Sequence, residues 1–380
     1  MTTLAVLREL RRGERRVAMV PAEIPKLTAA GLEVVVEAGA GVEAGFPDAD
    51  YAALTGVRVE SGRAAILAGV DIVVAVSPPG PDEAGELPEG AVLVSFLPPE
   101  SHLDTVVRLR DRRLTTFSFD LVPRTSRAQA IDALSSQASL AGYQAVLVAA
   151  ARLGRAIPMM MTAAGTVPPG RLLVMGAGVA GLQAIATARR LGASVRAYDV
   201  RPEAAEEVRS LGANFVELKL DAVLGEGGYA AEQSAAFQAR QQQLIADAVV
   251  ASDVVITTAA VPGRPAPRLV SAATVDRMRR GSVIVDLAAA SGGNCEVTVD
   301  GQDVHRAGVL VIGAGDMASQ VPTTASALYA RNVTNLLTLL VRDGRVEPDF
   351  ADDVVATTCV TSGGVVRHAP TRDLLEGASR

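Results

Sequence analysis

The chain has 380 residues and a formal net charge of −6, with 49% hydrophobic and 21% charged residues. This size predicts two domains with ample core, and the scattered basic residues argue against nucleic acid or an anionic membrane as a direct partner. The N-terminal stretch becomes charged too early for a secretory leader, and no run of about 18 apolar residues predicts a membrane span. Cys295 and Cys359 lack metal-site spacing, so we expect no metal and a reduced, cytosolic chain.

The first third of the chain alternates strand and helix signals. Apolar runs stand at 16–21, 32–41, 69–80, 90–99 and 114–124. Helix-like segments lie between them at 22–31 and 101–113, the first closed by Gly31 and the second with Ser101 as its expected N-cap. Strands separated by helices of this length predict βαβ units and a parallel sheet.

A second alternating series follows a long apolar helix expected at 135–153. Its strand candidates are 171–178, 193–199, 214–218, 253–260, 281–288 and 308–315. After about residue 320 the chain reads as one helix, 326–341, and a polar tail too short for a domain. We therefore expect two doubly wound α/β domains with parallel sheets around a cleft: a discontinuous outer domain of 1–136 and 320–380, and a Rossmann-like domain of 137–319.

The strongest motif is a G-x-G-x-x-G made by Gly176, Gly178 and Gly181. It follows an apolar strand and opens a helix, and a second strand ends in Asp199 about 20 residues on, which is the full dinucleotide-binding context. The first glycine permits the tight turn, the second lets backbone approach the pyrophosphate, and the third lets helix and strand pack closely. The helix N-terminus then offers N–H groups to the phosphates.

Asp199 indicates which dinucleotide binds. A carboxylate accepts hydrogen bonds from the adenine-ribose hydroxyls and repels a 2′-phosphate, so the sequence favours NAD(H) over NADP(H). Arg201 leaves an alternative open, because it could meet a 2′-phosphate, lie beside the adenine or bond a surface carboxylate.

The segment 219–243 is long for a connection in a compact fold. Gly225, Gly227 and Gly228 supply hinge-like freedom, and Tyr229 would ride at its tip. The segment is either a mobile lid over the nucleotide or a surface insertion.

Other conspicuous positions have plainer interpretations. The glycines of 309–317 lack the third glycine of the motif and predict a structural turn. His102 and His305 lie in charged segments expected to be helical, and His368 lies in the tail. None has a partner at ligand spacing, so surface or capping roles are expected.

The segment 123–143 is dense in hydrogen-bonding side chains but contains no His, Lys or Cys, the usual proton movers and nucleophiles. One interpretation is a polar helix start with Ser and Asp capping. The other is a segment that holds a ligand without moving a proton.

Long motifs in the chain resemble those of one family. They are PRTSRAQAIDALSSQASLAGYQAV (123–146), PMMMTAAGTVPPGRLLVMGAGVAGLQAIATARRLGA (158–193), GGYA (227–230), GSVIVDLA (281–288) and SGGNCE (291–296). Together, along essentially the whole chain, they resemble the NAD(H)-binding α subunit of proton-translocating nicotinamide nucleotide transhydrogenase. That family's soluble domain is also similar to alanine dehydrogenase, which is the alternative.

The resemblance implies a role for the polar segment, which matches a loop that holds the nicotinamide end of NAD(H) in that family. By position, Arg124 and Gln129 are expected to bond the nicotinamide or its ribose. Asp132 is expected to orient Arg124 and the carboxamide, and Ser135 to add a further bond.

The resemblance also implies the remaining site residues. Tyr229 matches the tyrosine of the family's mobile loop and completes the expected catalytic set. The expected cofactor-binding residues are the three motif glycines with Val179, Asp199, Val200, Arg201, Gly228, Gln241 and Ala260.

Proton chemistry separates the two relatives. An amino-acid dehydrogenase needs a proton donor and a group that polarises the carbonyl. Alanine dehydrogenases place a Lys and a His at positions that here match Ser77 and Pro98, and the only lysines, Lys26 and Lys219, lie elsewhere. Hydride transfer between two nicotinamides consumes no proton at the reacting carbons, so this chain departs from the dehydrogenase where proton chemistry would sit.

The resemblance implies partners as well. With one complete dinucleotide site here, NADP(H) must be bound by another chain, and the family's proton channel is membrane-embedded. We therefore expect a homodimer on the cytoplasmic side, held at the inner membrane through a proton-channel subunit and an NADP(H)-binding subunit. A third hypothesis, a non-catalytic NAD(H) sensor, would not need the dense polar segment.

Overall fold

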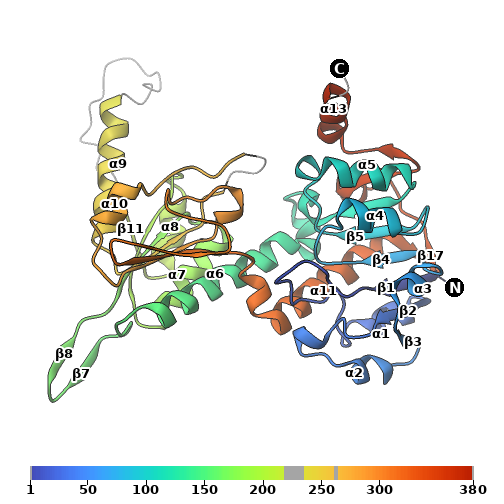
Figure 1. Ribbon diagram of the computed structural model, residues 1–380, viewed down its shortest axis with the longest axis horizontal. Helices are drawn as coiled ribbons and strands as arrows, with labels where there is room; N and C mark the ends of the chain where they lie inside the picture. The colour runs from blue at the N-terminus through green and yellow to red at the C-terminus, as the bar shows by residue number, and fades with distance from the viewer. Residues whose placement is uncertain (1, 218–234, 261–263, 379–380) are drawn as a thin grey trace. The chain divides into compact units, whose positions relative to one another are not determined.

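The computed structural model describes residues 2–217, 235–260 and 264–378. Contacts divide the chain into two units, which are treated separately below (Figure 1). Unit 1 contains residues 1–137 and 318–380 and is thus built from both ends of the chain. Unit 2 contains residues 138–317.

Unit 1 is built around an eight-stranded sheet of order β19-β18-β6-β5-β4-β1-β2-β3. Its strands are β1 (Thr2–Val6), β2 (Leu32–Glu37), β3 (Val57–Glu60), β4 (Ile72–Val74), β5 (Val92–Ser95), β6 (Thr115–Ser118), β18 (Cys359–Ser362) and β19 (Val365–Val366). The first six are parallel, and the last two add an antiparallel edge. The chain leaves β1 toward β2 and later places β4 on the other side, so the topological switch point lies between β1 and β4.

Short helices cover both faces of this sheet. They are α1 (Ile24–Ala29), α2 (Asp48–Ala52), α3 (Arg63–Leu67), α4 (Pro81–Glu86), α5 (Leu103–Asp111), α11 (Pro322–Leu340), α12 (Asp353–Thr358) and α13 (Ala369–Ala378). The 3-10 turns are η1 (Val42–Ala44), η2 (Pro99–Ser101), η3 (Phe119–Leu121), η4 (Ser126–Ile131) and η6 (Ala318–Gln320), and a small hairpin joins β16 (Val341–Arg342) to β17 (Arg345–Val346). Strand β1 explains the two layers, because Leu4 and Val6 enter one core cluster and Ala5 and Leu7 the other.

Unit 2 has a seven-stranded sheet of order β11-β10-β9-β12-β13-β15-β14, parallel except for β14. The strands are β9 (Arg171–Met175), β10 (Ser194–Tyr198), β11 (Asn214–Phe215), β12 (Val254–Thr257), β13 (Val283–Asp286), β14 (Asp303–Arg306) and β15 (Val309–Gly313). Along β9, Leu172 and Val174 pack on one side of the sheet, and Leu173 and Met175 on the other. Its continuous apolar run therefore reflects burial on both faces.

The helices of unit 2 include one that starts in unit 1. They are α6 (Ala133–Arg152), α7 (Val179–Arg190), α8 (Ala204–Ser210), α9 (Ala235–Val250), α10 (Ala272–Asp276) and the 3-10 turn η5 (Ala289–Ser291). Helix α6 packs closely on α7, since a Cβ on Gly142 would lie 2.0 Å from the carbonyl oxygen of Ala180. A hairpin of β7 (Met160–Thr162) and β8 (Gly165–Val167) projects from this unit (Figure 1).

Several expectations from the sequence are wrong. The run 16–21 forms no strand, because side chains of unit 1 take its backbone N–H groups: Ser326 accepts from Val17. Ser101 ends a 3-10 turn instead of capping α5, whose N-cap is His102. His305 lies in β14 and not in a helix. The tail is more than polar coil, since it adds β18 to the sheet of unit 1.

Candidate functional site

The glycine-rich turn joins β9 to α7 in unit 2. Gly176 has φ +101°, which favours glycine, and a Cβ there would lie 2.5 Å from the hydroxyl of Thr258. A Cβ on Gly181 would lie 1.8 Å from the carbonyl oxygen of Gly176. Gly178 instead faces open space, with no atom within 4 Å of its Cβ position. Two glycines are therefore required by packing, and the third leaves room for a ligand.

The first turn of α7 supplies donors at this open space. Gly178 is the N-cap of the helix, and Val179, the first helical residue, is 46% exposed. The first N–H groups of a helix have no partner within it, and the helix dipole adds a partial positive charge. The turn thus fits the pyrophosphate of a dinucleotide.

Asp199, just after β10, is tied to the same turn. Its carboxylate accepts from the N–H of Ala177 (2.7 Å) and from the N–H of Arg201 (2.8 Å). The Arg201 guanidinium donates to both carboxylate oxygens at 3.1 and 3.2 Å. Although burial favours the neutral acid, these donors hold the pKa of Asp199 below its ordinary value. Arg201 therefore pairs with a carboxylate here, and Asp199 stays ionised.

The Asp199→Ala variant is expected to bind NADH about 10- to 100-fold more weakly and to discriminate less against NADPH, because it loses charge-assisted bonds and charge repulsion. Titration of the protein with each dinucleotide measures both effects. Arg201→Ala is the matched control, because it leaves the bond between Asp199 and Ala177 in place and should keep NADH affinity within a few-fold. Unchanged NADH/NADPH selectivity in Asp199→Ala would contradict the assignment.

A wall of the turn comes from residues that sequence reasoning missed. Thr258, after β12, donates its hydroxyl to the carbonyl of Gly176 at 3.0 Å. Asn294 is fully buried, accepts from the N–H of Ala259 at 3.0 Å and donates to the carbonyl of Ala259 at 2.8 Å. This buried amide fixes the backbone beside the turn, and its only sequence signal was the motif SGGNCE.

The remaining predicted cofactor residues are placed as follows. Val200 is 75% exposed and Ala260 is exposed, at the ends of β10 and β12. Gln241 on α9 donates to the hydroxyl of Tyr198 at 2.6 Å, next to Asp199. Gly228 and Tyr229 lie outside the described residues.

The polar segment of unit 1 forms η4 and the start of α6. Asp132 accepts from the N–H of Ser135 at 2.8 Å and from its hydroxyl at 2.6 Å, so it caps the helix. Arg124 and Gln129 are exposed, and no hydrogen bond or ion pair among the described residues engages their side chains. The expected bond between Asp132 and Arg124 is thus not among those contacts. The segment offers a free guanidinium and a free amide beside a fixed carboxylate.

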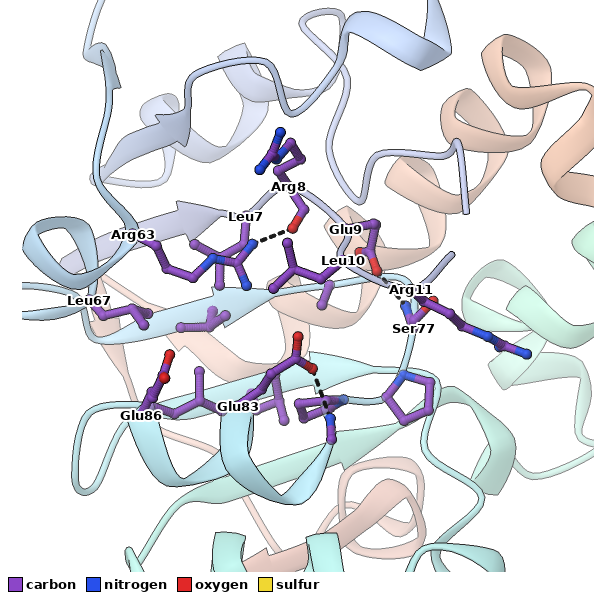
Figure 2. A pocket seen from close by; sticks show the side chains of 17 residues that line it. Leu7, Arg8, Glu9, Leu10, Arg11, Arg63, Leu67, Ser77, Glu83 and Glu86 are labelled. Carbon is purple, nitrogen blue, oxygen red and sulfur yellow. Dashed lines mark hydrogen bonds between the residues drawn. The ribbon is translucent and has the colours of Figure 1, made fainter. Parts of the chain in front are cut away.

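Figure 2 shows a pocket of about 280 Å³ at the switch point of unit 1. It is lined by the turn after β1 (residues 7–11), by α3 and α4, and by the loop after β4. The carboxyl group of Glu9 accepts from the N–H groups of Val76 (2.6 Å) and Ser77 (3.1 Å). The lining includes none of the described predicted site residues. Where a dehydrogenase would carry a Lys, this chain therefore has a Ser77 whose backbone is bonded to a buried carboxyl.

Burial raises the pKa of Glu9 from an ordinary value of 4.5 to about 7, despite the bonds from Val76 and Ser77. Protonated Glu9 therefore contributes stability that is complete below pH 4.5 and is lost as the pH rises to about 7, because the unfolded chain ionises first.

Glu9→Gln is expected to remove this loss, since the amide stays neutral and still accepts a bond. Its free energy of unfolding should exceed that of the parent by about 1–3 kcal/mol near pH 8 and match it near pH 4.5. Thermal unfolding across this pH range measures the difference. A constant gap at all pH values would show that Glu9 does not titrate in this range.

Two absences apply to the described residues of the chain. Their His, Cys, Asp and Glu side chains form no cluster that could hold a metal ion. Within those residues no helix has the length and apolar character needed to cross a membrane.

The fold and the turn define a two-unit, Rossmann-type dinucleotide-binding protein. Comparison with protein families matches "Alanine dehydrogenase/PNT, N-terminal domain" over residues 5–141 and "Alanine dehydrogenase/PNT, C-terminal domain" over residues 145–369. The chain belongs to the alanine dehydrogenase/PNT family.

Individual relatives separate the two branches of the family. The first segment of the split NAD(P) transhydrogenase subunit alpha of Rhodospirillum rubrum is 44% identical over 375 residues, covering 96% of this chain and 97% of that protein. The crystal structure of transhydrogenase from Sinorhizobium meliloti has a TM-score of 0.87 and 42% identity, covering 96% and 99% of the two chains. Alanine dehydrogenase of Bacillus subtilis is 27% identical over 390 residues, covering 98% and 94%. The similarity is greater to the transhydrogenase subunits.

Proposed function

We propose that this chain is the NAD(H)-binding subunit of a proton-translocating transhydrogenase, which passes hydride directly between NAD(H) on this chain and NADP(H) on a partner. One observation carries the proposal: a complete dinucleotide turn accompanies a polar segment whose free groups, Arg124 and Gln129, hydrogen-bond but do not exchange protons at neutral pH. The 44% identity to a transhydrogenase subunit supports it.

Each unit would supply one half of the binding site. In unit 2 the first turn of α7 binds the pyrophosphate, and Asp199 accepts from the adenine ribose once Arg201 gives way. In unit 1 Arg124 and Gln129 hold the nicotinamide carboxamide and ribose, beside the Asp132 that Ser135 keeps fixed. When bound, NADH supplies the hydride.

The protein's contribution is then orientation and exclusion of water. Neither oxygen of Asp132 is free to act as a base without breaking a bond to Ser135. A reaction that exchanges hydride between two nicotinamides needs no such base, because its barrier falls when the two reacting carbons are held at near-attack distance.

We also infer the partners from this function. NADP(H) would be bound by a second subunit, and proton movement would occur in a membrane-embedded channel subunit, since the described helices include no membrane span. The chain would then lie on the cytoplasmic side of the inner membrane and reach it through these partners.

A homodimer belongs to the proposal and is supported by the hairpin of β7 and β8. Its Met159, Met160 and Met161 are 59%, 45% and 78% exposed, and Val167 is 38% exposed. Such a run of apolar side chains on a projecting hairpin is typical of a surface covered by another protein.

The double variant Met160→Glu/Met161→Glu is expected to convert a dimer into a monomer of 39.1 kDa, because it places charge on the proposed contact. Sedimentation velocity measures the change. Val365→Glu, at a side chain that is 57% exposed on unit 1, is the control and should stay dimeric. A parent chain that is already monomeric would remove the homodimer from the proposal.

The function is tested by a rate assay with the purified chain, NADH and a spectrally distinct NADP⁺ analogue. Reduction of the analogue only when the NADP(H)-binding subunit is also present is the expected result. Oxidation of an amino acid with NAD⁺ by the chain alone would favour the dehydrogenase instead. Tight NADH binding with neither reaction would favour a sensor.

A further inference from the structure

The polar segment of unit 1 is held from behind by α11. Asn332 donates its side-chain N–H to the carbonyl of Ala130 at 3.0 Å and accepts from the hydroxyl of Ser136 at 2.9 Å. Ala130 lies in η4 and Ser136 in the first turn of α6, on either side of Asp132. One amide therefore ties together both ends of the stretch that carries the proposed nicotinamide contacts.

Asn332 stands on a face of α11 that is otherwise apolar. It is only 7% exposed, and its helical neighbours Tyr329, Val333 and Leu336 are fully buried. Asn is a poorer helix former than Ala or Leu, and a buried amide is costly unless it is bonded. A residue that breaks the local pattern in this way is typical of a functional position.

The bonds continue from Ser136 to a buried ion pair. Gln137 donates to the hydroxyl of Ser136 at 3.3 Å and accepts from Arg16 at 2.9 Å. Arg16 in turn binds both carboxylate oxygens of Glu14, at 2.7 and 2.6 Å, with both side chains almost fully buried. The start of α6 is thus joined to the loop after β1, which limits how far the segment can move.

We propose that Asn332 is a positioning residue, which fixes the backbone of 126–136 so that Arg124 and Gln129 are presented in the geometry needed for hydride transfer. This inference rests on the proposed function and deepens it. It does not require Asn332 to touch either nucleotide.

The test compares Asn332→Ala with Asn335→Ala. Asn335 is a matched control because it also donates to the carbonyl of Ala130, at 2.9 Å, but is exposed and does not reach Ser136. With NADH and the NADP(H)-binding subunit carrying an NADP⁺ analogue, Asn332→Ala should lower the single-turnover transfer rate about 10- to 100-fold. Its NADH dissociation constant should stay within about 3-fold, and Asn335→Ala should change neither by more than that.

Equal losses of rate and NADH affinity in Asn332→Ala would overturn the proposal, as would a parent-like rate. If that variant does not fold, Ser136→Ala removes one of the two bonds and should still slow transfer more than Asn335→Ala does. A parent-like rate for Ser136→Ala would then overturn the proposal.

Hydrogen exchange on the chain alone separates this inference from the proposed function. Asn332→Ala should increase exchange of the amides at 126–132, and Asn335→Ala should do so much less. Unchanged exchange in Asn332→Ala overturns the positioning role. Absence of transfer in the parent chain with faster exchange in Asn332→Ala would contradict the function and support the positioning role.

Discussion

Gln129→Ala is expected to slow hydride transfer about 100-fold while weakening NADH binding only a few-fold. The side chain of Gln129 is exposed, and its amide has no partner among the described residues, so both its donor and its acceptor are available to the nicotinamide carboxamide. A contact of this kind orients the reacting ring, and loss of orientation lowers the rate more than the affinity.

Arg127→Ala is the matched control for this variant. Arg127 lies two residues away in the same 3-10 turn, but its guanidinium is already paired with Asp352 and Asp353. Single-turnover transfer and NADH titration on both variants give the two quantities. Equal losses of rate and affinity in Gln129→Ala would mean that the residue merely anchors the nucleotide.

Gly181→Ala is expected to abolish NADH binding and to destabilise unit 2 by about 3 kcal/mol or more. Its Cβ would lie 1.8 Å from the carbonyl oxygen of Gly176, and backbone on backbone cannot rotate away. The close approach of α7 to β9 would therefore be lost, and with it the turn. Denaturant unfolding and NADH titration measure the two effects.

Gly178→Ala separates fold from ligand contact. Its Cβ position meets no atom within 4 Å, and its φ of −77° suits any residue, so the variant should unfold like the parent. It should nevertheless weaken NADH binding, because the methyl group occupies the space assigned to the pyrophosphate. A Gly178→Ala chain that binds NADH like the parent would contradict that assignment.

Much of the fold could be predicted because its signals are local. The apolar runs of both sheets have strand length and continuous hydrophobicity, which burial on two faces requires, as the split of Leu172 and Leu173 between two cores shows. The glycine turn was equally legible, because the conformation of Gly176 and the contact of Gly181 depend on glycine itself.

What could not be predicted depends on partners far along the chain. The run 16–21 is apolar enough for a strand, but Ser326, more than 300 residues away, takes the N–H of Val17. Asn332 reads as an ordinary polar residue of a helix until Ala130, 202 residues away, is seen to bind it. Asn294 likewise acts through Ala259, 35 residues earlier. No local pattern encodes these pairings.

The site itself was predictable to different degrees in its two halves. In unit 2 the turn and the acid after β10 meet, because Asp199 accepts from Ala177 inside the turn. In unit 1 sequence reasoning placed Asp132 beside Arg124, whereas the carboxylate bonds Ser135 and caps α6. Short polar segments offer several acceptors for one donor, and only the folded backbone decides between them.

The most direct test of the central claim follows the hydrogen itself. NADH carrying deuterium at both C4 positions is mixed with this chain, the NADP(H)-binding subunit and NADP⁺ in ordinary water, and the NADPH formed is analysed by mass spectrometry. Direct transfer predicts that each NADPH gains one deuterium from NADH. NADPH that carries only solvent hydrogen would contradict the account, because the hydride would then have passed through an exchangeable group.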